Sequence, residues 1–143
     1  MDVGAIRQAL ADAVSAAAIP GLSCFGYVPD SVPVPCFYAG EVEIDFDRAF
    51  GRGLDEVRVT CRVLVSRADD KSGQAALDAY LAGSGPGSLK TAIEAARGAP
   101  GVPALGGLAH DVHVVRVQGY RLYTVGEVEY YGAEITVRVI GKG

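Results

Sequence analysis

An alternating row of apolar residues in the middle of the chain constrains the fold more than any other feature of the sequence. The apolar positions are two residues apart: Val57, Val59, Cys61, Val63 and Val65. Polar residues stand between them, with Leu64 as the one apolar exception. Since side chains two apart in a strand share a face, residues 54–66 are predicted to form a central or near-central strand. One face packs on the core and the other meets water or a partner.

The preceding segment, 36–46, alternates in the same way. Val42, Ile44 and Phe46 point to one side, and the acidic residues between them point to the other. A Gly- and Arg-containing connection separates this segment from 54–66, which predicts a long hairpin. Because Phe46 is in register with Val42 and Ile44, we expect its ring to fold back onto the core.

The N-terminal third predicts a helix, a short strand and a loop. Residues 3–17 carry apolar side chains at 3.6-residue spacing, with Asp2 as a cap and Pro20-Gly21 as the stop. Residues 22–28 are rich in strand-forming residues. The stretch 29–35 contains three prolines and is predicted to be a loop.

Two further helices follow the central strand. Acidic residues at 69 and 70 begin the second helix, Leu77, Tyr80 and Leu81 mark its buried face, and Gly83 is expected to end it. After a flexible link, Ser88 is predicted to cap a third helix over about 89–97. The stretch 98–109 is rich in Gly and Pro and predicts a loop.

The C-terminal part predicts three strands. These are residues 111–118, 120–125 and 127–140, with a turn at Gly126 and a bulge at Gly132. No βαβ rhythm recurs along the chain. The sequence therefore predicts a single α+β domain over residues 1–143, with a largely antiparallel or mixed β-sheet and two to three helices packed on one face.

Charge and hydropathy exclude several function classes. The net charge is −4 and the basic residues are dispersed, whereas a general nucleic-acid binder needs a basic stripe. No run of about 18 apolar residues is present. The start of the chain lacks the layout of a signal peptide, so we expect a mature protein made in the cytosol.

The residues that usually carry catalysis or bind metals do not form a recognisable constellation. Residues 83–91 superficially resemble a phosphate-binding loop, but Leu89 stands where Gly must precede Lys90. His110 and His113 would point to opposite faces of a strand. The chain has an odd number of cysteines, Cys24, Cys36 and Cys61, and no CxxC motif. We therefore expect buried, reduced thiols. We expect no enzymatic activity, no cofactor and no metal.

Two groups of residues are candidates for a protein interface. The first comprises Glu41, Glu43 and Asp45, which share a strand face; a solvated sheet face is favoured over a cation site for them. The second lies in the connection 46–53, where Arg48, Phe50 and Arg52 are predicted to contact a neighbouring subunit or partner, because aromatic and Arg side chains dominate interface energetics. For Phe50, packing on its own core is an equal alternative.

The order and spacing of short motifs along nearly the whole chain resemble the tail-terminator proteins of long-tailed (siphovirus-type) actinobacterial phages. The motifs are AIRQALAD (5–12), IPGL (19–22), YVPDS (27–31), EIDFD (43–47), FGRG (50–53), LDAYLAGSG (77–85), SLK (88–90) and VEYYGAE (128–134). The Gly- and Pro-rich stretch 98–107 is the main departure from the family's pattern.

The resemblance implies a structural virion protein at the head-proximal end of the tail. Members of the family are expected to form a homohexameric ring on the tail tube, to stop tube polymerisation, and to receive the connector of the filled head. DNA passes through the lumen without being gripped. Two alternatives are another neck protein, such as a head-completion or connector subunit, and a small-molecule-binding α+β domain. Another neck protein would bind a different partner, which copurification would show. A small-molecule-binding domain requires a pocket with convergent polar groups.

Overall fold

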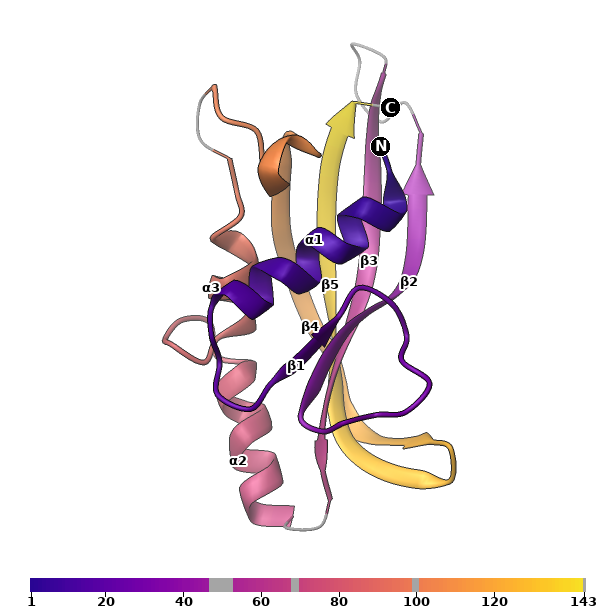
Figure 1. Cartoon of the computed structure of the whole chain (residues 1–143), viewed down its shortest axis with the longest axis vertical. Coiled ribbons are helices and arrows are strands. Elements are labelled where there is room, and N and C mark those ends of the chain that lie inside the picture. The colour runs from indigo at the N-terminus through magenta and orange to yellow at the C-terminus, as the bar shows by residue number, and fades with distance from the viewer. Residues whose placement is uncertain (47–52, 68–69, 99–100, 143) are drawn as a thin grey trace.

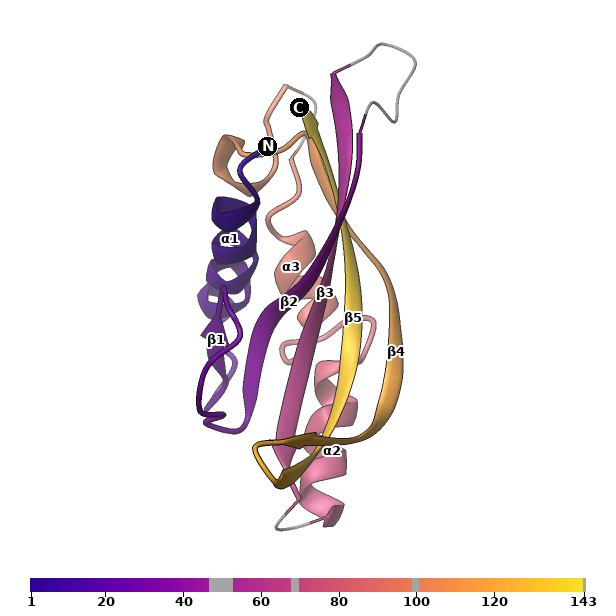
Figure 2. The ribbon, with the colours of Figure 1, turned by 90° about the vertical axis from the view of Figure 1, so that its right-hand side faces the viewer.

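A five-stranded sheet with helices on one face makes up the protein (Figures 1 and 2). The computed structural model describes residues 1–46, 53–67, 70–98 and 101–142. The elements are α1 (Val3–Ala16), β1 (Ser23–Phe25), β2 (Cys36–Asp45), β3 (Leu54–Ser66), α2 (Asp70–Tyr80), α3 (Leu89–Glu94), the 3₁₀ turn η1 (Leu105–Gly107), β4 (Asp111–Val125) and β5 (Val128–Lys142). The predicted α+β class is confirmed.

The strand order in the sheet is β1-β2-β3-β5-β4, which places β3 in the centre as predicted. β1 runs parallel to β2, and every other neighbouring pair is antiparallel, so the sheet is mixed. β2 and β3 form the predicted hairpin. The chain ends lie close together at one end of the sheet, where the Met1 amino group donates to the Lys142 carbonyl (Figure 1).

The core lies between the sheet and the three helices. The side chains of the predicted apolar row of β3 are at most 2 % exposed. Beside them on the same face of the sheet lie the buried side chains of β5, Ala133, Ile135, Val137 and Val139. The helices contribute Ile6, Leu10, Val14, Leu77, Leu89 and Ile93, all at most 1 % exposed. Burying each such side chain stabilises the fold by about 1.5–3 kcal/mol.

Local capping interactions fix the helix ends. The Asp2 carboxylate accepts a hydrogen bond from the Ala5 amide at 3.1 Å, as predicted for the start of α1. The helix ends at Ala16, and Ala18 with a positive φ of 52° turns the chain before Pro20. The Ser88 hydroxyl accepts from the Thr91 amide at 3.2 Å, which confirms the predicted cap of α3.

Several predicted boundaries are wrong. β1 covers only three residues of the predicted 22–28, and α2 ends at Tyr80, before Gly83. The predicted strands 111–118 and 120–125 are one strand, β4, because Gly119 adopts a positive φ of 66° within a bulge that keeps the pairing with β5.

The predicted bulge at Gly132 is wrong as well. Gly132 pairs in register with both Leu64 and Arg121. A Cβ atom there would lie 2.6 Å from the Leu64 Cδ2 and 2.7 Å from the Val63 carbonyl oxygen. Glycine is therefore needed for close packing rather than for a change of register.

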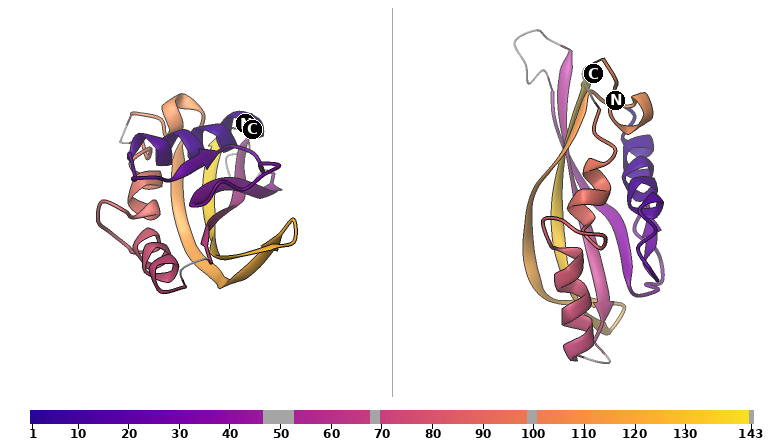
Figure 3. Two further views of the ribbon diagram at one scale, coloured as in Figure 1. Left: turned by 60° about the horizontal axis from the view of Figure 1, so that its bottom comes forward. Right: turned by 90° about the vertical axis from the view of Figure 1, so that its left-hand side faces the viewer.

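No helix of the described chain lies on the second face of the sheet, hereafter the open face (Figure 2). A small apolar cluster covers one part of it, formed by Cys36, Tyr38, Leu64 and Tyr123 with side chains from the 25–34 segment. The turn end of the β4–β5 hairpin bends sharply away from the long axis of the sheet beside this cluster (Figures 1 and 3). No helix in the described part of the chain is long and apolar enough to cross a membrane.

Candidate functional site

The open face carries paired charges along its central strands. Arg62 on β3 donates to the Tyr38 hydroxyl at 3.1 Å and to the Glu134 carboxylate at 3.2 Å. The guanidinium groups of Arg62 and Arg121 each lie 4.4 Å from the centre of the Tyr123 ring. Cation–π contacts of this kind hold the charged groups against the sheet.

Burial and charge act in opposite directions on Tyr38. Desolvation raises the pKa of its hydroxyl, and the neighbouring Arg62 charge partly opposes this rise. The net pKa lies above that of an ordinary tyrosine, so the hydroxyl stays protonated and accepts the hydrogen bond from Arg62.

A second charge cluster surrounds Glu56, which is 4 % exposed. Its carboxylate lies 2.8 Å from the Arg58 Nε and 4.0 Å from the Arg138 Nε. Nearby, the Thr136 hydroxyl donates to the Gln118 side-chain oxygen at 3.1 Å. Positive and negative groups are mixed on this face, where Arg58 and Arg138 share the carboxylate of Glu56, so its described residues form no basic stripe that would bind phosphates strongly.

A shallow hollow of about 170 Å³ lies on the open face. Its lining residues are Val28, Tyr38, Gly40, Glu41, Thr60, Arg62 and Glu134. Ligand pockets usually enclose about 300–1,000 Å³ with convergent polar groups, and here Arg62 and Glu134 already bind each other. Other surface hollows of about 340, 290 and 320 Å³ have few polar side chains in their lining: His110 in the first, His110 and Lys142 in the second, and Asp12 in the third.

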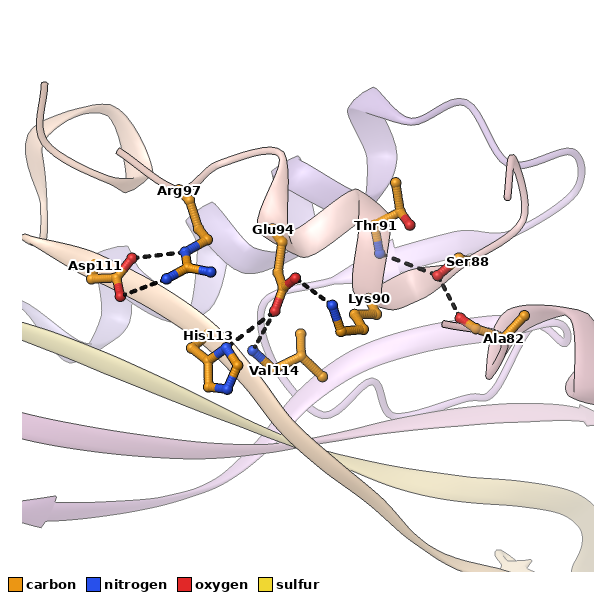
Figure 4. Close-up of polar contacts among 9 residues, drawn as sticks. All are labelled: Ala82, Ser88, Lys90, Thr91, Glu94, Arg97, Asp111, His113 and Val114. Carbon is orange, nitrogen blue, oxygen red and sulfur yellow. Dashed lines mark hydrogen bonds and ion pairs between the residues drawn. The ribbon is translucent and has the colours of Figure 1, made fainter. Parts of the chain in front are cut away.

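The α3 helix protects one end of the outer strand, β4 (Figure 4). The Glu94 carboxylate accepts from the Val114 amide at 3.1 Å and lies 3.3 Å from the His113 Nδ1 and 2.6 Å from the Lys90 Nζ. Two parallel hydrogen bonds join Arg97 to Asp111, at 3.0 and 3.2 Å. These contacts satisfy an edge amide that would otherwise be free to pair with another chain.

The two histidines do not lie together in a group of possible metal ligands in the described chain. His113 contacts Glu94, whereas His110 is exposed and its amide bonds to the Ile140 carbonyl. Among the described residues, no group of three His, Cys, Asp or Glu side chains could hold a metal ion.

The cysteines are free thiols in two different environments. Cys61 lies in the main core and Cys36 in the open-face cluster, and burial raises their pKa values to about 12 and about 11. Cys24 is partly exposed, so the prediction of burial holds for two of the three. A thiol with a raised pKa is a poor nucleophile at neutral pH.

The acidic interface candidates lie at the outer edge of the sheet. Glu43 and Asp45 point to the open face, opposite Arg58 and Glu56 of β3. Glu41 lies in a bulge between Ala39 and Val42 that the alternation did not predict. All three carboxylates are exposed, as expected for a solvated face.

The other interface candidates, Arg48, Phe50 and Arg52, lie outside the described residues. Beside them, Phe46 is 71 % exposed, so the prediction that it folds onto the core is wrong. Ile44 is also 38 % exposed. Strands β2 and β3 extend past the helices at this end of the sheet (Figure 2), where Ile44 and Phe46 are exposed.

Sequence reasoning missed the cluster around Arg62 and the exposed apolar residues of β4. The polar positions Arg58, Thr60 and Arg62 alternate along the central strand, and this pattern signals a polar face on a buried strand. The partners Tyr38 and Glu134 are far away in sequence, and only the register brings them together. Compared with known proteins, the chain matches no family model and no curated protein.

Proposed function

We propose that this chain is the tail-terminator subunit of a long-tailed phage, made in the host cytoplasm and located in the neck of the virion. Six copies form a ring on the completed tail tube, stop tube polymerisation and provide the surface to which the head's connector attaches. The proposal starts from the ordered set of motifs that extends from residue 5 to residue 134.

The observation that carries the proposal is the presence of exposed apolar side chains on two separate strands. Ile44 and Phe46 are exposed on β2. Val115, Val117, Tyr120 and Leu122 are exposed on β4, at the other side of the sheet. Exposed apolar residues rimmed by charged ones favour contact with other proteins, and a ring subunit needs two different surfaces of this kind.

The open face also suits a subunit of a channel that DNA traverses. Its arginines are largely paired with carboxylates, as in the Arg62–Glu134 and Arg58–Glu56 pairs. Such a surface has little excess positive charge with which to retain DNA, because retention depends on neutralising phosphates.

In vitro polymerisation of the phage's tail tube protein tests the proposal. With the purified chain added, we expect short tubes with one end capped, and without it, longer tubes of unlimited length, as measured by negative-stain electron microscopy. Tube lengths that are unchanged by the chain contradict the proposal. Copurification with a head-completion protein but not with tubes would instead indicate another neck component.

A further inference from the structure

The outer edge of β2 is open in the described chain where the strand extends past the helices (Figure 2). β1 pairs only with Cys36–Tyr38, and the Arg7 guanidinium donates to the Ala39 carbonyl at 3.0 Å. Beyond Ala39, no described strand pairs with the outer side of β2. An unprotected edge strand presents unpaired N–H and C=O groups and is a template for pairing with another chain. Residues 41–46 are hereafter the acidic edge.

The acidic edge is regular enough to accept another strand. After the bulge between Ala39 and Val42, the pairing with β3 continues without a shift in register to Asp45. At the opposite edge of the sheet, the Glu94 carboxylate accepts from the Val114 amide, and two register shifts interrupt β4. Bulges and covering side chains of this kind keep an edge strand from pairing further. The page of contacts on β2 shows no such protection beyond its single bulge in the described chain.

The side chains of the acidic edge divide between two faces. Ile44 lies on the helix side, because it aligns with the core residue Val57. Ile44 and the next apolar residue, Phe46, are both exposed. Glu43 and Asp45 alternate with them and lie on the open face. A strand added here would therefore meet apolar side chains on one face and carboxylates on the other.

The carboxylates of the acidic edge form no ion pair within the described chain. Arg58 lies opposite Glu43, but its guanidinium binds the Glu56 carboxylate at 2.8 Å. Asp45 aligns with Glu56, so two carboxylates occupy facing positions on neighbouring strands. The third acidic residue, Glu41, lies in the bulge and is exposed. Like charges on facing strands oppose each other, and a cation beside them relieves this repulsion.

The described chain contains no free segment of its own that fits this edge. Outside the helices and strands, the Lys and Arg residues that the structure describes are Arg67 and Arg97. Arg67 is paired with Glu129, and Arg97 is paired with Asp111. The net charge of −4 also makes a second copy a poor electrostatic match, because like charges disfavour association. The acidic edge therefore fits a different protein.

We propose that the acidic edge pairs with an extended basic segment of another protein, which adds a strand to the sheet beside β2. In this mode of recognition, main-chain hydrogen bonds supply affinity and alternate side chains supply specificity. The segment carries Lys or Arg at every second position, beside Glu43 and Asp45. Apolar residues stand between them, beside Ile44 and Phe46. The inference goes beyond the proposed function, because it depends on this edge and not on a ring.

A designed peptide tests the pairing with the purified chain. The probe alternates lysine with valine over the length of the edge and is blocked at both ends. We expect saturable binding, and we expect the amides of alternate residues within 41–46 to exchange with solvent about tenfold more slowly in the complex. Hydrogen exchange followed by NMR measures this protection. The absence of binding, or binding that protects no amide of the edge, overturns the proposal.

Two control peptides separate strand pairing from charge attraction. One has the composition of the probe with its lysines and valines in separate blocks, so it cannot present one kind of side chain to each face. The other is the probe with methylated backbone amides, which cannot donate hydrogen bonds. We expect each to bind about tenfold more weakly than the probe. Equal binding by all three peptides would indicate charge attraction alone and would overturn the added strand.

Charge reversal on the protein tests the acidic edge itself. Glu43→Lys with Asp45→Lys should weaken binding of the probe by about tenfold, because facing charges become alike. The matched control, Asp12→Lys with Glu127→Lys, changes the net charge equally at exposed positions on α1 and in the β4–β5 turn. Its affinity for the probe should stay within about twofold of the wild type, because distant surface charges are screened. An equal loss in both variants overturns the proposal.

Two further outcomes separate this edge from a contact between copies and from the tail-terminator function. If the wild type self-associates and Glu43→Lys with Asp45→Lys abolishes the self-association, the edge receives a second copy, and the assignment to another protein is wrong. Tube-length measurements test the function independently. If the probe binds as expected but the chain leaves tube length unchanged, the acidic edge stands and the tail-terminator function fails.

Discussion

Single buried side chains on β3 hold the two layers together, and Val63 is the clearest example. It is fully buried between the sheet and the helices. Val63→Asp removes about 1.5–3 kcal/mol of apolar burial and adds an unpaired buried carboxylate, against a total stability of about 5–15 kcal/mol. We expect no soluble folded protein, as measured by expression and circular dichroism.

The matched control is Val128→Asp, at a position that is 49 % exposed beside the β4–β5 turn. Surface changes of this kind usually alter stability by less than about 0.5 kcal/mol. If both variants fold with the same melting temperature, the register of β3 is wrong.

Gly132 gives a second test at the residue scale, because the structure assigns it a packing role. Gly132→Ala places a methyl group against the Leu64 side chain and the Val63 carbonyl. We expect a loss of about 1–3 kcal/mol in the free energy of unfolding, measured by chemical denaturation. Gly83→Ala, where nothing lies within 4 Å of the new Cβ, should cost nothing measurable. Equal stability of the two variants would contradict the close approach of β5 to β3.

At the scale of secondary-structure elements, the contact between α3 and β4 depends on an ionised Glu94. Burial raises the pKa of this carboxyl, but hydrogen bonds from Lys90 and from the Val114 amide outweigh it and lower the pKa overall. A lowered pKa in the folded state contributes stability above the unfolded value of about 4.3, and this is lost as the pH falls through the folded value. The Arg97 bonds lower the pKa of Asp111 in the same direction.

Glu94→Gln should therefore lower stability at neutral pH by about 1–2 kcal/mol, through loss of charged hydrogen bonds. The difference from the wild type should shrink as the pH falls below about 4, because the wild-type carboxyl is then protonated as well. Urea unfolding at a series of pH values measures both effects. Glu127→Gln, in the exposed turn, serves as the control. A deficit that is undiminished at roughly pH 2 would contradict the charge argument.

The sequence predicted the elements well where a pattern is long and local. The central strand was predicted with its observed bounds because the apolar alternation from Val57 to Val65 is long and regular. Short or bulged elements were predicted less well. Gly119 reads as a break between strands in the sequence, yet the pairing with β5 keeps the strand continuous across it. Propensity is local, whereas this pairing depends on a partner strand.

On the scale of the whole molecule, the candidate site was only partly predictable. The exposed carboxylates of β2 follow from the alternation of its sequence. Phe46 follows the same alternation, but its exposure depends on how far the hairpin extends beyond the helices, which no local pattern encodes. The outer position of β4 likewise emerges only from the strand order, because β4 becomes an outer strand through the placement of β5 beside β3.

The central claim is that copies of this chain close into a ring at the end of a tail tube. Electron cryo-microscopy of tubes assembled with the chain measures this most directly, as the rotational symmetry of the terminal layer. We predict one layer of six copies at the end of the tube. A terminal layer without rotational symmetry, or tube ends that lack the chain, would contradict the claim.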